Sequence, residues 1–144
     1  GIADGRGVAA AFCLGAEGVQ VGTRMVCCSE CSVHQNYKEA IIKARDRSNV
    51  VTGRPTGHPV RCLKNKLTSR FEELESAGAS IEEIEKLGTG RLRAAVVNGD
   101  VEWGSLMAGQ SSAMINDIKP AAEIIHAMFD EAAGVIAKLP HFVF

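Results

Sequence analysis

The stretch LGAEGVQVGTRMV, Leu14 to Val26, decides the expected fold. A helix is expected to end at Leu14–Gly15, and a short apolar strand is expected at Val19–Val21, running directly into Gly22 and Thr23. A Gly–Thr pair on its own is often a plain turn. Behind a buried parallel strand it also suits phosphate, because backbone N–H groups and the hydroxyl can donate to the anion. The stretch therefore predicts a parallel α/β fold with a candidate phosphate site.

A second glycine-rich turn, GIADGRG at residues 1–7, lies upstream. Asp4 is placed to cap the helix that follows, and Val8, Ala11 and Phe12 give that helix an apolar stripe. A helix between two such turns is typical of a βα repeat. We therefore expect both turns at the carboxyl-terminal mouth of one parallel sheet or barrel.

Composition narrows the class of protein. The 144 residues are 46% hydrophobic and 23% charged, which is typical of a globular domain. The formal net charge of -1 offers no basic field for nucleic acid and no polybasic membrane anchor. No apolar run approaches the ~20 residues of a membrane-spanning helix. We expect a cytoplasmic protein with no nucleic-acid or membrane partner; no signal peptide is visible, although the chain starts like an internal segment.

The cysteines are the first candidates for a metal site. There are five, an odd number without framework spacing, which favours reduced thiols: Cys13, Cys27, Cys28, Cys31 and Cys62. Cys28 and Cys31 form a C-x-x-C, which is half of a zinc site or a redox pair. No second C-x-x-C or spaced histidine pair completes four ligands. We therefore expect no metal, and thiols that are buried or lie in loops.

The middle of the chain, residues 27–103, has the pattern of a small helical insertion. A capping box at Ser32–Gln35 is expected to open a first helix, and a short strand is expected at Asn49–Thr52. Three further helices are expected: one from Val60 to Leu74 that ends at Gly78, one capped by Ser80 and Glu83 that ends at Gly88, and one from Leu92 to Asn98. Helical structure returns after Pro120, where an apolar stripe extends from Ile124 to Ile136 and Pro140 is expected to stop it.

Four segments carry a family resemblance: GIADGRGVAAAFCLGAEGVQVGTR, HQNYKEAIIKARD, TGHPVRCLKN and GDVEWGSLMAGQ. In this order they resemble the C-terminal part of the FMN-dependent enoyl-[acyl carrier protein] reductase II family, within the nitronate monooxygenase (2-nitropropane dioxygenase-like) group of flavin barrels. The resemblance extends from Gly1 to about Ala137. It implies an α/β chain that forms the C-terminal part of a TIM (β/α)8 barrel: residues 1–26 end the barrel, residues 27–103 form a mostly helical, substrate-covering insertion, and residues 104–144 return to the barrel.

The resemblance also implies an FMN site. Phosphate-binding barrels hold the phosphate between the loops that follow strands seven and eight. The two glycine-rich turns would be these two loops. The implied cofactor-binding residues are Gly1, Ile2, Ala3, Gly22 and Thr23 at the phosphate, and Met107, Ala108 and Gln110 near the isoalloxazine ring. The family's catalytic histidine belongs to an earlier barrel loop that this sequence does not include.

The remaining basic residues are given other roles. We expect His58 and Arg61 to order a loop, and His34, His126 and His141 to have no catalytic part. Three basic residues could attract an acidic carrier protein or a phosphorylated cofactor, although such residues are more often solvated or paired locally: Arg24, Arg61 and Lys64.

The implied reaction is reduction of FMN by NAD(P)H, followed by hydride transfer to an enoyl thioester on acyl carrier protein in fatty acid biosynthesis. The intact enzyme would be a homodimer. Two alternatives stay open. The same scaffold supports nitronate oxidation, so a nitronate monooxygenase is one alternative. The other is a non-catalytic fragment or subunit that needs a partner to complete the barrel.

Overall fold

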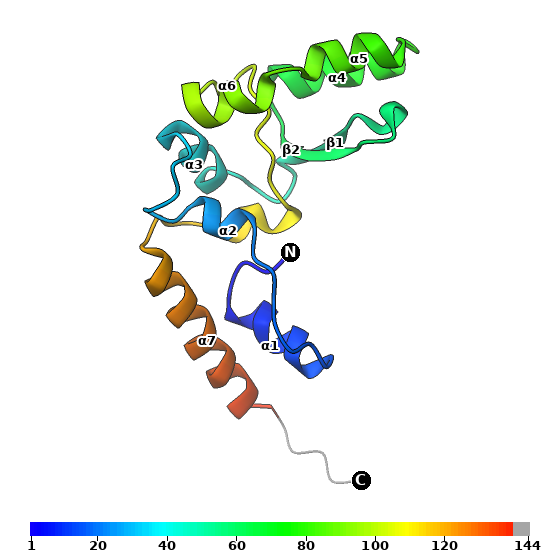
Figure 1. The fold of residues 1–144 in the computed structure, drawn as a ribbon. Coiled ribbons are helices and arrows are strands. Elements are labelled where there is room, and N and C mark those ends of the chain that lie inside the picture. Colours follow the sequence, from blue (N-terminus) through cyan, green and yellow to red (C-terminus); the bar gives the residue numbers. More distant parts are fainter. Residues whose placement is uncertain (140–144) are drawn as a thin grey trace.

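The computed structural model describes residues 1–139 and places the elements in two regions (Figure 1). The first region holds α1 (Gly5–Cys13), α2 (Thr23–Val26) and α7 (Ala121–Ala137). The second holds α3 (Gln35–Ile42), β1 (Asn49–Thr52), β2 (Val60–Leu63), α4 (Lys66–Ser76), α5 (Ile81–Gly88) and α6 (Arg91–Asn98), with the 3-10 helices η1 (Arg54–Thr56) and η2 (Gln110–Met114). Pro140 and His141 lie outside the described residues.

Helix α1 packs along α7, and its ends form as the sequence predicts (Figure 1). The Asp4 side chain accepts hydrogen bonds from the backbone N–H groups of Arg6 and Gly7, which caps the helix. Gly15 follows the helix with a φ of +91°, which only glycine adopts without strain. The buried cluster between α1 and α7 consists of Val8, Ala9, Cys28, Ile124, Met128 and Ala132. No helix among residues 1–139 is both long and apolar enough to cross a bilayer.

The strand predicted at Val19–Val21 is wrong: these residues form no regular secondary structure and no strand pairing. A strand is defined by hydrogen bonds to a neighbour, and the only sheet within residues 1–139 is the two-stranded one formed by β1 and β2. Val19 and Val21 instead lie half-buried against the α1 and α7 core. The apolar pattern therefore correctly indicated partial burial, but no neighbouring strand pairs with this segment within residues 1–139.

The β1–β2 hairpin confirms one prediction and corrects another. β1 forms at Asn49–Thr52 as expected, and it pairs antiparallel with β2, Asn49 lying opposite Leu63. The helix predicted from Val60 begins only at Lys66. Asn65 is the reason, because its side chain accepts from the Thr68 N–H in a capping box and so fixes the helix start. The β-branched and apolar residues before it pair as a strand.

The other helix ends also test the expected caps. Helix α3 begins at Gln35 with His34 as its N-cap, so the predicted Ser32–Gln35 capping box is wrong: the His34 Nδ1 accepts from the Asn36 N–H at 3.1 Å. The capping box between Ser80 and Glu83 is confirmed. Helix α7 begins one residue after Pro120, which is its N-cap rather than its first helical residue.

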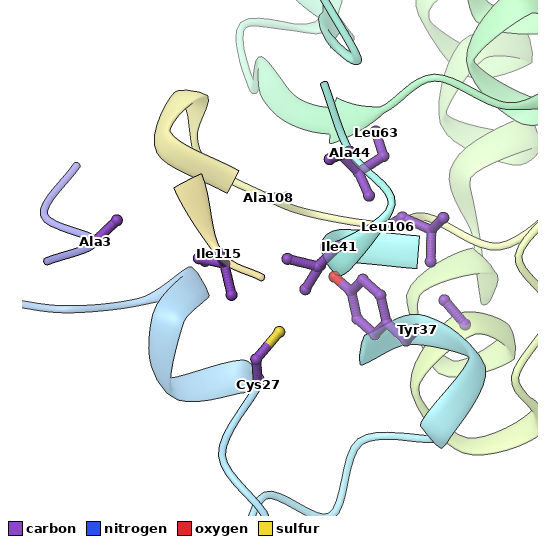
Figure 2. Packing of buried hydrophobic residues seen from close by; sticks show 10 residues of the cluster. Ala3, Cys27, Tyr37, Ile41, Ala44, Leu63, Leu106, Ala108 and Ile115 are labelled. Atoms are coloured by element: carbon purple, nitrogen blue, oxygen red, sulfur yellow. The ribbon is translucent and has the colours of Figure 1, made fainter. Parts of the chain in front are cut away.

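The second region has its own core (Figure 2). Its centre is Ile41 and Tyr37 of α3, which are almost fully buried. The cluster is completed by Ala3, Cys27, Ala44, Leu63, Ala95, Leu106, Ala108 and Ile115. These residues come from all three of the segments into which the sequence was divided. The insertion at residues 27–103 therefore shares its core with the chain on either side, and the division into domains stays a prediction.

Candidate functional site

A surface hollow of about 420 Å³ forms where the start of α2, strand β2 and the segment before η2 meet. Its lining residues are Gly22, Thr23, Val26, Arg61, Met107, Ala108 and Gly109. Four of the eight predicted cofactor-binding residues are therefore brought to one place, although more than 80 residues of sequence separate the two pairs. This hollow is the candidate site.

The Thr23 hydroxyl links the two sides of the hollow. Its Oγ1 accepts a hydrogen bond from the Gly109 N–H at 2.9 Å. The oxygen thus acts as an acceptor, and its own proton stays available for a ligand. The first helical hydrogen bond of α2 is donated by the Met25 N–H to the Gly22 carbonyl, so the N–H groups of Thr23 and Arg24 precede the helical ladder.

The segment at residues 106–108 is joined to β2 by an isolated antiparallel bridge between Met107 and Cys62. The Ala108 N–H donates to the Arg61 carbonyl at 3.1 Å. The Tyr37 hydroxyl donates to the Met107 carbonyl at 2.7 Å, and the Asn49 side-chain amide donates to the Ala108 carbonyl at 3.1 Å. Reading the sequence missed Tyr37, Asn49 and the lining role of Arg61, because nothing local in the sequence indicates that β2 and this segment pair.

The other four predicted residues lie outside the wall of the hollow. Gly1 approaches η2 closely, so that a Cβ on Gly1 would lie 2.8 Å from the Ser111 Oγ. Gln110 is exposed at the start of η2. Ala3 is buried in the core, and Ile2 is half-buried against the α1–α7 contact. The first glycine-rich turn is thus near η2 but does not line the hollow.

Arg24 is not available to a ligand or a carrier protein, contrary to one expectation. Its side chain is buried and its guanidinium donates to the carboxylate and the carbonyl of Asp117. A hydrogen bond from Lys119 and the nearby Arg24 charge outweigh burial and hold the pKa of Asp117 below its ordinary value, so the pair is ionised at neutral pH. Arg61 and Lys64 are exposed, and only Arg61 lines the hollow.

The described histidines do not reach the hollow. His34 caps α3, and His58 and His126 are exposed. His58 lies in a turn where its N–H donates to the Thr56 Oγ1, and Arg61 is a strand residue of β2. A role of these two side chains in ordering the loop stays a prediction.

The cysteines are all free thiols. Burial raises the pKa of Cys27 to about 11, so this thiol is neutral at physiological pH. The carbonyls of Cys28 and Cys31 each accept a hydrogen bond of 2.7 Å from the buried Lys38 ammonium. Within residues 1–139, no three histidine, cysteine or acidic side chains are grouped as metal ligands would be.

The residues of the hollow fit the phosphate end of FMN. A Cβ built on Gly22 would meet no atom within 4 Å, so the backbone there is open to a ligand. The free hydroxyl proton of Thr23, the N–H groups that open α2 and the Arg61 guanidinium are donors and charges that suit a phosphate.

Comparisons with known proteins identify the family of the chain. Residues 1–131 match the family model described as nitronate monooxygenase. Nitronate monooxygenase of Paraburkholderia phytofirmans is 32% identical over 143 residues, which are 99% of this chain and 39% of the relative. The structure of FabK from Thermotoga maritima superposes with a TM-score of 0.90 at 47% identity, covering 95% of this chain and 43% of FabK. A nitroalkane oxidase from Streptomyces ansochromogenes superposes with a TM-score of 0.76 at 26% identity, covering 96% and 39%.

The fold defines the C-terminal portion of a TIM-barrel protein of the family that includes FabK and the nitroalkane oxidase. The chain belongs to the nitronate monooxygenase family, which is FMN-dependent. It spans about two fifths of the length of the relatives that it matches. The resemblance and the fold class predicted from the sequence are confirmed. The unpaired Val19–Val21 segment is also explained, because a barrel strand needs neighbours on both sides.

Proposed function

We propose that this chain is part of an FMN-dependent enoyl-[acyl carrier protein] reductase that uses NAD(P)H in fatty acid biosynthesis. The observation that carries the proposal is the greater likeness to FabK, an enoyl-[acyl carrier protein] reductase II. Identity to FabK is 47% with a TM-score of 0.90, against 26–35% for the relatives named for nitronate or nitroalkane oxidation. When bound, FMN supplies the hydride that the reaction needs.

The chain's own residues would hold and orient the cofactor. The Thr23 hydroxyl, the backbone at Gly22 and the Arg61 guanidinium would bind the phosphate. Met107 and Ala108 would present backbone and apolar side chain to the flat ring and exclude water from it. The hydrogen bonds that fix Met107 and Ala108 from behind would keep this wall in place during turnover. The contributions of Gly1, Ile2, Ala3 and Gln110 stay part of the proposal.

The proposed partner is acyl carrier protein, whose acidic surface would meet exposed cations. Lys66 is paired with Glu102 and Arg70 with Glu73, each through a salt bridge on the surface. Lys64 is exposed beside them and Arg61 is exposed at the hollow. These two side chains are therefore the proposed contacts for the carrier's acidic groups. Such exposed contacts steer association more than they add affinity.

A nitronate monooxygenase is the second candidate, and the family model and the Paraburkholderia relative favour it. The decisive experiment measures two rates with the protein at its full natural length and added FMN. One is NAD(P)H oxidation that depends on crotonyl-[acyl carrier protein], and the other is oxygen uptake with an alkyl nitronate. We expect the first to dominate. Dominant oxygen uptake with the nitronate would favour the alternative, and no turnover in either assay would favour a non-catalytic subunit.

A further inference from the structure

A second hollow, of about 110 Å³, lies inside the helical region between the β1–β2 hairpin, α4 and α6. Carbon side chains form much of its wall, among them Val60, Leu67, Phe71 and Leu92. Two of its polar side chains are already bonded: the Thr68 hydroxyl to Asn65, and the Ser105 hydroxyl to the Cys62 thiol. The hollow therefore offers mostly hydrocarbon surface to whatever enters it.

Met107 joins this hollow to the candidate cofactor site. It lines both hollows, so it is a wall that the two share. Its place follows from the strand register: Met107 forms an antiparallel bridge with Cys62, and residues directly opposite each other across strands share a face. Cys62 on that face lines the inner hollow. The two hollows therefore meet at the Met107 side chain.

We propose that the inner hollow binds the acyl tail of the thioester substrate, with Met107 at its entrance; this rests on the proposed reductase function. The volume of the inner hollow indicates how long an acyl tail it can hold. A dry apolar cavity of about 150 Å³ takes up benzene, which has six carbons, so 110 Å³ holds about four. The carbons beyond the β-carbon of an octenoyl chain would fill it, whereas a crotonyl chain would leave it nearly empty. The inner hollow is thus a chain-length selector.

Gly88, the last residue of α5, provides the variant that fills the hollow. It lines the hollow, and a Cβ there would meet only the Phe71 ring, at 3.4 Å. In Gly88→Leu the new side chain would occupy the space of the tail. Each buried methylene is worth about fourfold in binding, so kcat/KM for an octenoyl thioester should fall at least tenfold while that for a crotonyl thioester changes less than twofold. Gly88→Ala should show a smaller change in the same direction, and it guards against misfolding of the larger variant.

Thr52 provides a variant with the opposite effect. It is 1% exposed and lines the hollow. A tail of pure hydrocarbon gains nothing from the Thr52 hydroxyl. Thr52→Val, which replaces the hydroxyl by a methyl group, should raise kcat/KM for the octenoyl thioester about twofold or more. A gain of activity cannot come from misfolding.

The experiment uses the protein at its full natural length. The control is Gly134→Leu on α7, because a Cβ on Gly134 meets no atom within 4 Å and Gly134 does not line the hollow. Binding of octanoyl- and butanoyl-pantetheine, measured by calorimetry, is the readout that does not need turnover. If Gly88→Leu loses octanoyl binding and Gly134→Leu does not, the result supports the hollow as a tail site. This holds even if the protein reduces no enoyl thioester, because the absence of turnover would overturn only the reductase function. Equal effects of Gly88→Leu on both chain lengths, or none on either, would overturn the acyl-tail site.

Discussion

The two regions of this chain treat their apolar surface differently. The region of α3, the hairpin and α4 to α6 encloses two isoleucines almost fully: Ile41 is 0% and Ile84 1% exposed. In the region of α1 and α7, Ile125 and Phe129 are 47% and 48% exposed and line one apolar hollow with Val19 and Val21. The helical region also exposes large apolar residues, such as Ile81 and Val97, but they are scattered, which is normal on a protein surface.

This difference indicates which contacts each region is built to make. The helical region finds its core within residues 1–139. The α1–α7 pair covers only part of its apolar surface, and the rest faces the side where the unpaired Val19–Val21 segment lies. The relatives are more than twice as long and belong to a TIM-barrel family, so we expect barrel elements to cover that side. The helical region is therefore expected to be stable alone and the barrel region to depend on further strands and helices.

The largest expected effect is the dependence of activity on the rest of the barrel. We predict that the 144-residue chain alone binds FMN weakly or not at all and shows no enoyl reductase turnover, because a barrel with a missing side leaves strand edges and the cofactor site incomplete. The measurement is a flavin spectrum and NAD(P)H oxidation with a crotonyl thioester. A chimera in which the unmatched N-terminal part of Thermotoga maritima FabK precedes this chain should restore both.

Robust NAD(P)H oxidation by the 144-residue chain alone, dependent on the enoyl substrate, would contradict this prediction. It would mean that the two regions already form a working site between them. A chimera that binds flavin but reduces nothing would instead keep the structural comparison and weaken the reductase assignment.

A second prediction compares one buried side chain from each region. Ile41→Ala should lower the free energy of unfolding of the 144-residue chain by about 2–5 kcal/mol, because it leaves a cavity in an enclosed core. Phe129→Ala should cost about 1 kcal/mol or less, since its ring is half exposed and contacts Phe12 at a centroid distance of 6.2 Å. Urea titration measures both. In the FabK chimera the Phe129→Ala cost should rise toward that of a buried aromatic; equal costs in the two proteins would show that no barrel covers this face.

The sequence predicted the parts of the fold that local signals encode. The Asp4 cap, the Ser80–Glu83 capping box and strand β1 follow from side chains within a few residues of one another. The strand at Val19–Val21 failed for the opposite reason, because its partners are not local. Val60–Leu63 was assigned to the following helix because its apolar spacing continues into α4, and only the Asn65 cap separates the two.

The candidate site follows the same division. Gly22 and Thr23 were found because a strand followed by a glycine and a hydroxyl residue is a local pattern, and Met107 and Ala108 through a family resemblance. Arg61 and the Thr23–Gly109 hydrogen bond depend on which segments pair across the molecule, which no local pattern encodes. Arg24 was offered as a surface cation because its partner Asp117 is 93 residues away.

The third prediction tests the hollow between the regions. In the protein at its full natural length, Thr23→Val should lower FMN affinity roughly ten- to hundredfold, because a lost hydrogen bond to a charged group costs ~1.5–3 kcal/mol. Gly22→Val should also weaken binding by blocking approach to the backbone. Thr89→Val, an exposed threonine whose hydroxyl bonds only within its own helix end, is the matched control and should leave affinity unchanged. Flavin titrations that do not change for Thr23→Val and Gly22→Val would remove this site.

The smallest effect is expected where the chain turns from one region to the other, at Cys28 and Cys31. We predict that neither thiol binds zinc or forms an obligatory disulfide, because the contacts that fix this turn are made by their carbonyls, which accept from the Lys38 ammonium. Cys31→Ser keeps the carbonyl and should change the free energy of unfolding by about 0.5 kcal/mol or less. Lys38→Met should cost more, about 1–3 kcal/mol, since it removes the ammonium donor from both carbonyls and leaves the Cys28 carbonyl only the 3.3 Å hydrogen bond from the Cys31 N–H. Urea titration and metal analysis of the purified protein measure these effects. Stoichiometric zinc that disappears in Cys28→Ser or Cys31→Ser would show that the thiols, rather than the backbone beside them, hold the two regions together here.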